Sequence, residues 1–196
     1  CIYGGSELKA IVMGDSHANA LISAMQAALP LPQQGAMELT YPSCPTLLGA
    51  HRTNQKYSQC TDFNNWAVEK LTRDHIGVPL IIVNRSTSMA YGVIESDATT
   101  KPNQPMVYFS KIVSTPTPDF LNEFRESLIN TACTIAQNRP VYFVRPIPEM
   151  GINVPKILSR SLMFGNGDPN ISTSLTDYHK RHFFIWEAQD QAAKRC

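Results

Sequence analysis

The segment KAIVMGDSHANAL, residues 9–21, contains the transition that decides the fold. The apolar run KAIVMG ends at Gly14, and a helical pattern then extends through SHANALISAMQAAL, residues 16–29. These patterns predict a buried strand that leads through a tight turn into a helix. Ser16 then has two interpretations. It is either a nucleophile exposed at the end of the strand or an ordinary helix cap, since Asp and Ser are both preferred there.

The rest of the chain continues this alternation of strands and helices. Further strands are expected over residues 36–43, 80–84 and 139–148. Helices are expected over residues 63–75 (capped by Thr61 or Asp62), 117–138, 154–165 and 177–195 (capped by Thr176). Residues 86–116 are predicted to form a long loop over one end of the sheet. The order predicts an α/β fold of three layers, a parallel sheet between helices.

Length and composition limit the classes of protein that fit. The 196 residues are enough for one domain with a buried core, and no internal repeat or domain boundary is visible. A formal net charge of +1 without a Lys/Arg stripe argues against nucleic-acid binding. Apolar runs such as PLIIV are too short to cross a membrane. No phosphate-binding glycine loop and no metal-ligand spacing is present, so neither cofactor nor metal is expected.

Five cysteines favour an oxidising compartment. Cys44 and Cys60 flank a polar stretch, and a disulfide closing it would contribute about 3 kcal/mol in the chain-entropy model. A metal site is the alternative there, but no ligand spacing supports it. Cys133 lies in an apolar helical pattern and is predicted to be a buried thiol. Cys1 and Cys196 are terminal, and any partners they have are expected outside this chain.

Polar groups follow the predicted strands at Gly14-Asp15-Ser16, Asn84-Arg85-Ser86 and Arg145. Functional groups of parallel sheets gather at the carboxyl ends of the strands. At such a position the Ser16 hydroxyl is exposed, and its backbone N–H lies at the positive end of a helix, where it can hold an oxyanion. The sequence therefore offers Ser16 as a candidate nucleophile for acyl transfer.

The string GDSHANAL resembles the first block of the SGNH (GDSL-type) hydrolases, whose nucleophile is the Ser of Gly-Asp-Ser. His17 narrows the resemblance to the SGNH domains fused behind the transmembrane helices of bacterial acyltransferases that O-acetylate surface polysaccharides. YPSCPTLLG, CTDFNNWA, PLIIVNRS and VYFVRPIPEM are similar to later segments of those domains. The resemblance implies a flavodoxin-like sheet and a catalytic motif of Gly14, Asp15, Ser16 and His17.

The resemblance also implies that Asn84 or Arg85 contacts the oxyanion or the substrate. The third block of the superfamily is Gly-x-Asn-Asp, whereas this chain has VNRST. An Asn amide or an Arg guanidinium could still donate to an oxyanion. Alternatively, Arg85 simply pairs with a carboxylate. Gly49 is a weak substitute for the glycine of the second block.

A serine nucleophile needs a histidine base oriented by a carboxylate. His17 adjoins Ser16 but points in a different direction, and His51 and His75 have no supporting signature. In SLTDYHKRHFF, Lys180 stands where an Asp-x-x-His block starting at Asp177 would need histidine, so His179 and His182 are predicted to form a solvated face of the last helix. In the fused domains the Asp-x-x-His block follows this helix. We therefore expect the SGNH fold to lack its C-terminal end, with the base and the orienting acid encoded beyond Cys196.

The main functional hypothesis is an extracytoplasmic domain of an O-acyltransferase. It moves an acetyl or short acyl group through a Ser16 acyl-enzyme to a cell-surface polysaccharide such as lipopolysaccharide O-antigen. The expected partners are that acylated carbohydrate or polysaccharide and a membrane-embedded acyltransferase domain in the same full-length chain. The expected location is the periplasm, tethered by an N-terminal transmembrane domain not present here. A free secreted carbohydrate esterase and a non-catalytic carbohydrate-binding domain of the same fold are the alternatives.

Overall fold

The computed structural model describes residues 1–95, 103–165, 167 and 169–196. The strands are β1 (Ile2–Gly4), β2 (Glu7–Gly14), β3 (Gln34–Thr40), β4 (His51–Arg52), β5 (Leu80–Val83), β6 (Val107–Tyr108) and β7 (Val141–Phe143). The helices are α1 (Ser16–Ala27), α2 (Cys60–Arg73), α3 (Ser86–Tyr91), α4 (Pro118–Ala136), α5 (Val154–Phe164) and α6 (Leu175–Arg195), with a 3-10 turn at Gln55–Tyr57.

The main sheet has the order β1-β3-β2-β5-β7, and its four strands after β1 are parallel. The parallel strands therefore follow the order 2-1-3-4 of flavodoxin-like folds, as expected from the sequence. After β2 the chain adds β3 on one side of it, and it then adds β5 and β7 in turn on the other side. The point where the strand order reverses lies between β2 and β5, and ligands bind at such points in open α/β sheets.

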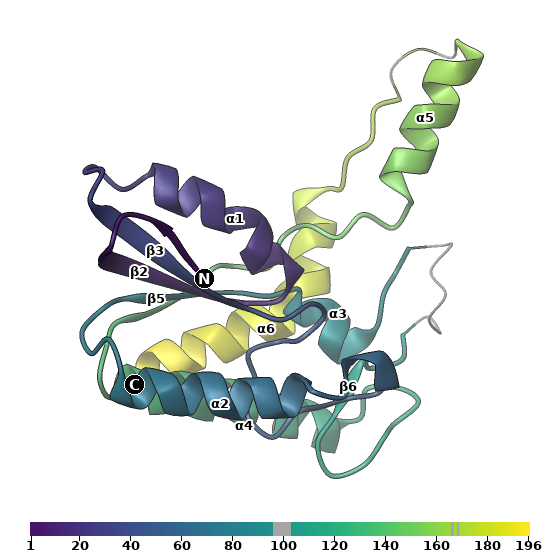
Figure 1. The fold of residues 1–196 in the computed structure, drawn as a ribbon. Coiled ribbons are helices and arrows are strands. Elements are labelled where there is room, and N and C mark those ends of the chain that lie inside the picture. Colours follow the sequence, from purple (N-terminus) through teal and green to yellow (C-terminus); the bar gives the residue numbers. More distant parts are fainter. Residues whose placement is uncertain (96–102, 166, 168) are drawn as a thin grey trace.

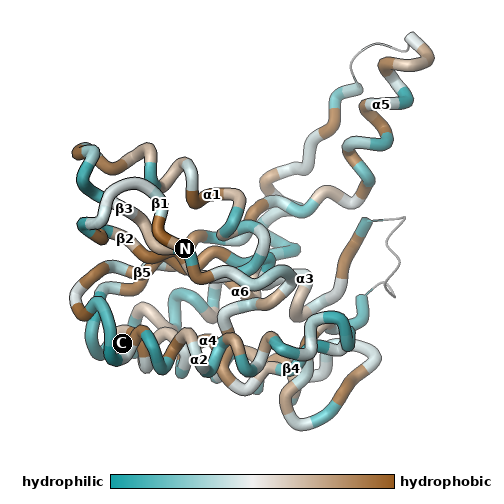
Figure 2. Tube along the Cα trace, viewed as in Figure 1, coloured by the Kyte–Doolittle hydropathy of each residue, from teal (hydrophilic) through white to brown (hydrophobic). Residues whose placement is uncertain are grey.

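Helices cover both faces of the sheet, so β2 is buried on both sides from Ala10 to Gly14, where its residues are apolar (Figures 1 and 2). Ala10 and Val12 pack under α1 on one face, with Ala18 and Ile22 of that helix. Ile11 and Met13 point to the other face, into a core shared with α2 and α4. The three-layer α/β prediction is confirmed.

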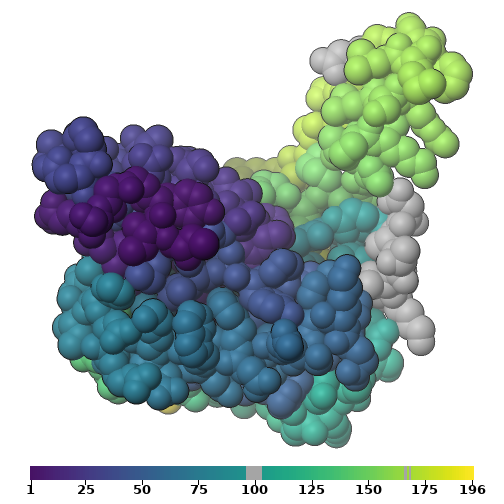
Figure 3. Space-filling model, in the orientation of Figure 1, coloured from purple at the N-terminus to yellow at the C-terminus, as the bar shows by residue number. Residues whose placement is uncertain are grey.

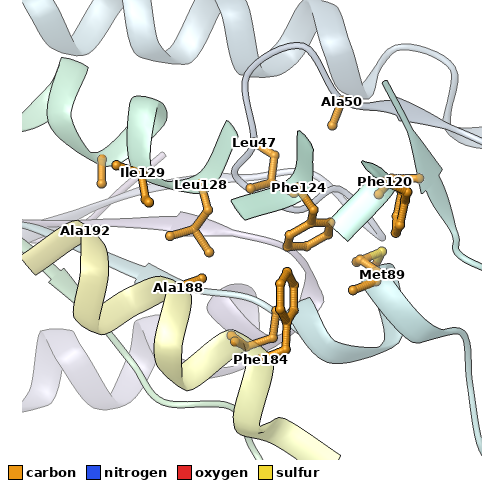
Figure 4. Close-up of a cluster of buried hydrophobic side chains, with 14 residues drawn as sticks. Leu47, Ala50, Met89, Phe120, Phe124, Leu128, Ile129, Phe184, Ala188 and Ala192 are labelled. Atoms are coloured by element: carbon orange, nitrogen blue, oxygen red, sulfur yellow. The ribbon is translucent and has the colours of Figure 1, made fainter. Parts of the chain in front are cut away.

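A separate core joins the C-terminal helices. Phe124 of α4 and Phe184 of α6 meet with ring centroids 5.9 Å apart, and Leu128 and Ala188 continue the contact along both helices (Figure 4). This packing holds α6 beside α4 along much of its length. The start of α6 is thereby positioned near α3 and the chain that follows β5.

Two disulfides close the fold. Cys44 pairs with Cys60, as predicted. Cys133 pairs with Cys196, so the predictions of a buried thiol at Cys133 and of an external partner for Cys196 are wrong. The sequence does not reveal this pair because its partners are brought together only when α6 packs on α4. Cys1 is a free, exposed thiol.

Several boundaries differ from the sequence prediction. The expected loop 86–116 contains α3 and β6, while its residues 96–102 lie outside the described residues. α2 begins at Cys60 without a side-chain cap, so the prediction that Thr61 or Asp62 caps it is wrong; both lie inside the helix, and the Thr61 hydroxyl donates to the carbonyl of Ala50 instead. Ser174, not Thr176, caps α6, accepting a hydrogen bond from the Asp177 N–H.

Candidate active site

Asp15, not Ser16, is the N-cap of α1. Its carboxylate is buried, and Oδ1 accepts a hydrogen bond of 2.8 Å from the backbone N–H of His17. The Nδ1 of His17 lies 3.2 Å from the same oxygen. Because Asp15 satisfies the first turn of the helix, the Ser16 hydroxyl is not used for capping. Ser16 is exposed at the first position of α1, beside the positive end of the helix.

Gly14 allows the ends of β2 and β5 to approach closely. It has a φ of +151°, and a Cβ there would lie 1.9 Å from the carbonyl oxygen of Val83 and 2.8 Å from Oδ1 of Asn84. No side chain fits at that distance from a backbone atom. The glycine thus brings the turn before Ser16 against the residues that follow β5.

The two strand ends are also joined by a hydrogen bond. Oδ2 of Asp15 accepts from the backbone N–H of Arg85 over 2.7 Å. Asn84, next to Arg85, accepts a long hydrogen bond of 3.4 Å from the Thr46 hydroxyl. The two oxygens of Asp15 therefore accept hydrogen bonds from two segments. Oδ1 caps α1, and Oδ2 holds the chain after β5 at the point where the strand order reverses.

The guanidinium of Arg85 is held by two carboxylates. Its Nε donates to Oε1 of Glu149 over 3.0 Å, and its Nη2 pairs with Oε1 of Glu95. Burial disfavours the charge on Arg85, but Glu149 and Glu95 outweigh it and raise the pKa of the guanidinium. Arg85 therefore pairs with carboxylates, which is the alternative interpretation given in the sequence analysis. An oxyanion or substrate role for Arg85 or Asn84 stays a prediction.

Glu149 links Arg85 to α6. Its side chain is only 2% exposed, and its second oxygen, Oε2, accepts 2.8 Å from Nε of Arg181. Arg181 also donates to the carbonyl of Gly92 over 2.6 Å. One carboxylate thus binds two arginines, one with each oxygen, and this bridge ties the segment after β7 to α6 and to the chain beyond α3.

An open cavity of about 450 Å³ lies beside this bridge. His17, Arg85, Glu95 and Glu149 line one part of it, and the chain of residues 147–155, which leads into α5, lines the rest. The cavity combines charged groups with the side chains of Ile147, Ile152 and Val154. It is large enough for a small ester or part of a sugar, and it reaches the start of α1 through His17, the residue after Ser16.

No histidine of the chain hydrogen-bonds to Ser16 among the residues with described structure. His17 contacts Asp15, and His51 contacts Thr61. His182 is 1% exposed, which corrects the prediction of a solvated face, and its Nδ1 shares a hydrogen bond of 2.6 Å with Thr87. It is buried because α6 packs on α3 there, whereas His179 is exposed as predicted.

Arg52 places a second buried cation in this region. Its side chain has Nη1 at 2.7 Å from Sδ of Met89, while Nε and Nη2 are buried without a hydrogen-bond partner. Burial lowers the pKa of Arg52 to about 10, and Tyr57 and Asp15 partly oppose that shift. The Asp15 carboxylate therefore interacts electrostatically with the buried Arg52 guanidinium, in addition to accepting two backbone hydrogen bonds.

Sequence reasoning missed the ionic bridge. Glu149 stands in the quoted segment VYFVRPIPEM, where its position after two prolines was the available signal. Arg181 lies between His179 and His182 in the stretch SLTDYHKRHFF, and no local pattern there indicates an ion pair. Arg145, noted after its strand, lies over the ring of Trp186 and pairs with Asp190 of α6, and it does not enter this bridge.

Among the described residues no cluster of three or more His, Cys, Asp or Glu side chains could hold a metal ion. In the same part of the chain, no helix combines the length and apolar character needed to cross a bilayer.

The fold is that of an α/β domain with a mostly parallel sheet, and its Gly-Asp-Ser turn places the candidate nucleophile Ser16 between a central strand and the helix that follows it. Over residues 1–196 the sequence matches the family described as SGNH domain (fused to AT3 domains), and the chain belongs to that family. No curated protein sequence matches it.

Among solved structures, the fold is similar to the periplasmic domain of a lipopolysaccharide acetyltransferase from Salmonella ser. Paratyphi A. The TM-score is 0.59 at 16% sequence identity, and the match covers 98% of this chain and 66% of that chain. The present chain therefore spans less than two thirds of the neighbour. At this identity the likeness establishes the fold, which agrees with the flavodoxin-like prediction.

Proposed function

We propose that this domain carries the acyl-transfer step of an O-acyltransferase. Ser16 accepts an acetyl or short acyl group and passes it to a hydroxyl of a cell-surface polysaccharide, such as lipopolysaccharide O-antigen. The observation that carries the proposal is that Asp15, and not Ser16, caps the start of α1. This leaves the Ser16 hydroxyl exposed at the carboxyl end of β2, and the next residue, His17, lines the charged cavity. The family membership supports the reaction class.

The reaction has two balanced steps. The Ser16 oxygen attacks the acyl carbonyl carbon, its proton passes to a base, and the donor leaves with a proton. A sugar hydroxyl then attacks the acyl-enzyme, its proton passes to the base, and the Ser16 oxygen leaves and is reprotonated. The backbone N–H of Ser16, at the start of α1, stabilises the oxyanion of both tetrahedral intermediates, and Asn84 or Arg85 is the proposed further contact.

The base and its orienting acid are proposed to come from an Asp-x-x-His segment beyond Cys196. Support comes from the absence of any described histidine bonded to Ser16. The sheet also has room at that side, because β7 is its outer described strand and borders a cavity of about 510 Å³ against α6. In this arrangement the domain of residues 1–196 is C-terminally incomplete.

The proposed setting is the periplasmic face of a bacterial membrane. A membrane-embedded acyltransferase domain, N-terminal in the same full-length chain, delivers the acyl group. This is supported by the family description, which names fusion to AT3 domains, and by two disulfides that suit an oxidising compartment.

The test uses the full-length protein in its host. Ser16→Ala should abolish acetylation of the surface polysaccharide, measured by mass spectrometry or NMR of the isolated glycan, whereas Ser23→Ala, an exposed serine of the same helix, should leave it unchanged. Trapping with an activated acetyl ester should add one acetyl group to Ser16 in the wild type only.

The same experiment separates the alternatives. Hydrolysis of acetylated carbohydrate by the wild type, without transfer to the polysaccharide, would assign a carbohydrate esterase. Normal O-acetylation by Ser16→Ala, together with binding of the glycan, would assign a non-catalytic carbohydrate-binding domain.

A further inference from the structure

α5 projects from the body of the domain (Figures 1 and 3), and its sequence ends in three apolar residues. Leu162, Met163 and Phe164 are 79%, 79% and 71% exposed at its last turn. Large apolar side chains left in water in one group mark a surface that another medium or molecule covers. None of these three residues contributes to the core clusters or to the cavity lined by His17 and Arg85.

The positions of the three residues identify what covers them. They are consecutive in sequence, so they point in three directions spread over about 200° of the helix circumference. A groove on a protein, or a second copy of this chain, covers one face of a helix and selects residues three or four apart. A helix tip with apolar groups on several sides is covered when it enters a medium that surrounds it, as the outer region of a bilayer does.

The charges behind the tip fit the same medium. The sequence of α5, VPKILSRSLMF, contains Lys156 and Arg160 and no acidic residue. Arg160 lies roughly 4.5 Å behind Met163 along the axis, and Lys156 roughly 10 Å behind it. Both side chains are exposed. Cations at this distance from an inserted apolar tip lie at the depth of lipid phosphates.

We propose that the tip of α5 docks into the surface of an anionic lipid bilayer, with Leu162, Met163 and Phe164 inserted below the headgroups. The base of α5, residues 152–155, lines the same cavity as His17 and Arg85. The docked helix therefore holds that cavity at a fixed height above the membrane. In a chain that carries a membrane acyltransferase domain, which rests on the proposed function, the tether would keep the tip close to lipid.

The test is co-sedimentation of the chain with vesicles of phosphatidylethanolamine and phosphatidylglycerol, against vesicles of phosphatidylcholine alone. We expect binding to the anionic vesicles and at least a tenfold loss of the partition coefficient in Leu162→Ser/Met163→Ser/Phe164→Ser. Arg160→Gln should weaken binding to the anionic vesicles only. The matched control is Ile76→Ser/Ile112→Ser, which removes two exposed apolar side chains from other loops and should bind like the wild type.

Circular dichroism and urea unfolding of each variant establish that it folds. Absence of binding to anionic vesicles, or equal binding of the tip variant and wild type, would overturn the proposal. A concentration-dependent dimer in sedimentation velocity that the tip substitutions abolish would also overturn it, in favour of a second copy. Because Ser16→Ala should bind vesicles normally, failure of the acyl-transfer proposal and failure of the docking proposal give different results.

Discussion

The backbone N–H of Arg85 donates to Oδ2 of Asp15 over 2.7 Å, which joins the ends of two adjacent parallel strands at the proposed active site. The other oxygen of Asp15 caps the helix that begins with Ser16. The position of the candidate nucleophile is thus set by a single buried carboxylate, which receives donors from both sides of the point where the strand order reverses.

Asp15→Asn should therefore destabilise the domain by about 2 kcal/mol, because an amide can place an acceptor toward only one of the two backbone donors and turns its NH₂ toward the other. The free energy of unfolding in urea measures this loss. Asp62→Asn, an acidic residue of the first turn of α2, is the control and should cost less than about 0.5 kcal/mol. Equal losses in the two variants would contradict the central role of Asp15.

Gly14→Ala should be more damaging than an alanine at another glycine of positive φ. The new Cβ would lie 1.9 Å from the Val83 carbonyl, so β2 and β5 would have to separate at Ser16. Gly49 has a φ of +74° but open space around a Cβ, so Gly49→Ala should cost only about 1 kcal/mol of backbone strain. Thermal unfolding of the two variants compares them, and a smaller loss at Gly14 would show that the strand ends adapt.

The sequence was sufficient for the fold because the strands buried on both faces are continuous apolar runs and the helices carry one apolar stripe. It also located the Gly14-Asp15-Ser16 turn, since turn chemistry is local. It could not determine which of Asp15 and Ser16 caps α1, because both residues suit that position and the Arg85 N–H that engages Asp15 is 70 residues away.

The parts that sequence reasoning missed depend on contacts between distant segments. Glu149, Arg181 and the Cys133–Cys196 disulfide become neighbours only through the packing of α6. His182 looked like part of a polar helix start, and it is buried because α3, a helix that the sequence did not predict, packs beside it. Ion pairs and buried polar groups follow from tertiary packing, for which local periodicity has no signal.

Glu149→Gln should destabilise the domain by about 1–3 kcal/mol, because it removes the carboxylate that two arginines share. The guanidinium groups of Arg85 and Arg181 are partly exposed, so solvent screening limits the loss. The exposed pair of Glu126 and Arg195 supplies the control, and Glu126→Gln should cost less than about 0.5 kcal/mol. Urea unfolding at low and high salt distinguishes the two, since the buried bridge should depend less on salt.

Removing the Cys133–Cys196 disulfide as a pair of serines should lower the free energy of unfolding by about 4 kcal/mol, against about 3 kcal/mol for the Cys44–Cys60 pair. The difference follows from the sequence separations, 63 and 16 residues, because the longer loop gains more entropy when it is opened in the unfolded chain. Denaturant unfolding of the two double variants tests the order. The reverse order would mean that residual structure in the unfolded chain, rather than loop length, controls the effect.

His182 should make the domain less stable as the pH falls below about 6.5, the ordinary pKa of the imidazole in the unfolded chain. Burial lowers the pKa of His182 in the folded state, Glu149 opposes the shift, and Arg181 adds to it. The unfolded chain then binds the proton first, so stability is complete above that pH and declines as the pH falls toward the folded value.

His182→Gln removes this titration, and the difference in unfolding free energy between wild type and variant should shrink from pH 8 to pH 5. A constant difference would show that the imidazole is not protonated on unfolding. His179→Gln, an exposed neighbour on α6, should leave the pH dependence of the wild type unchanged.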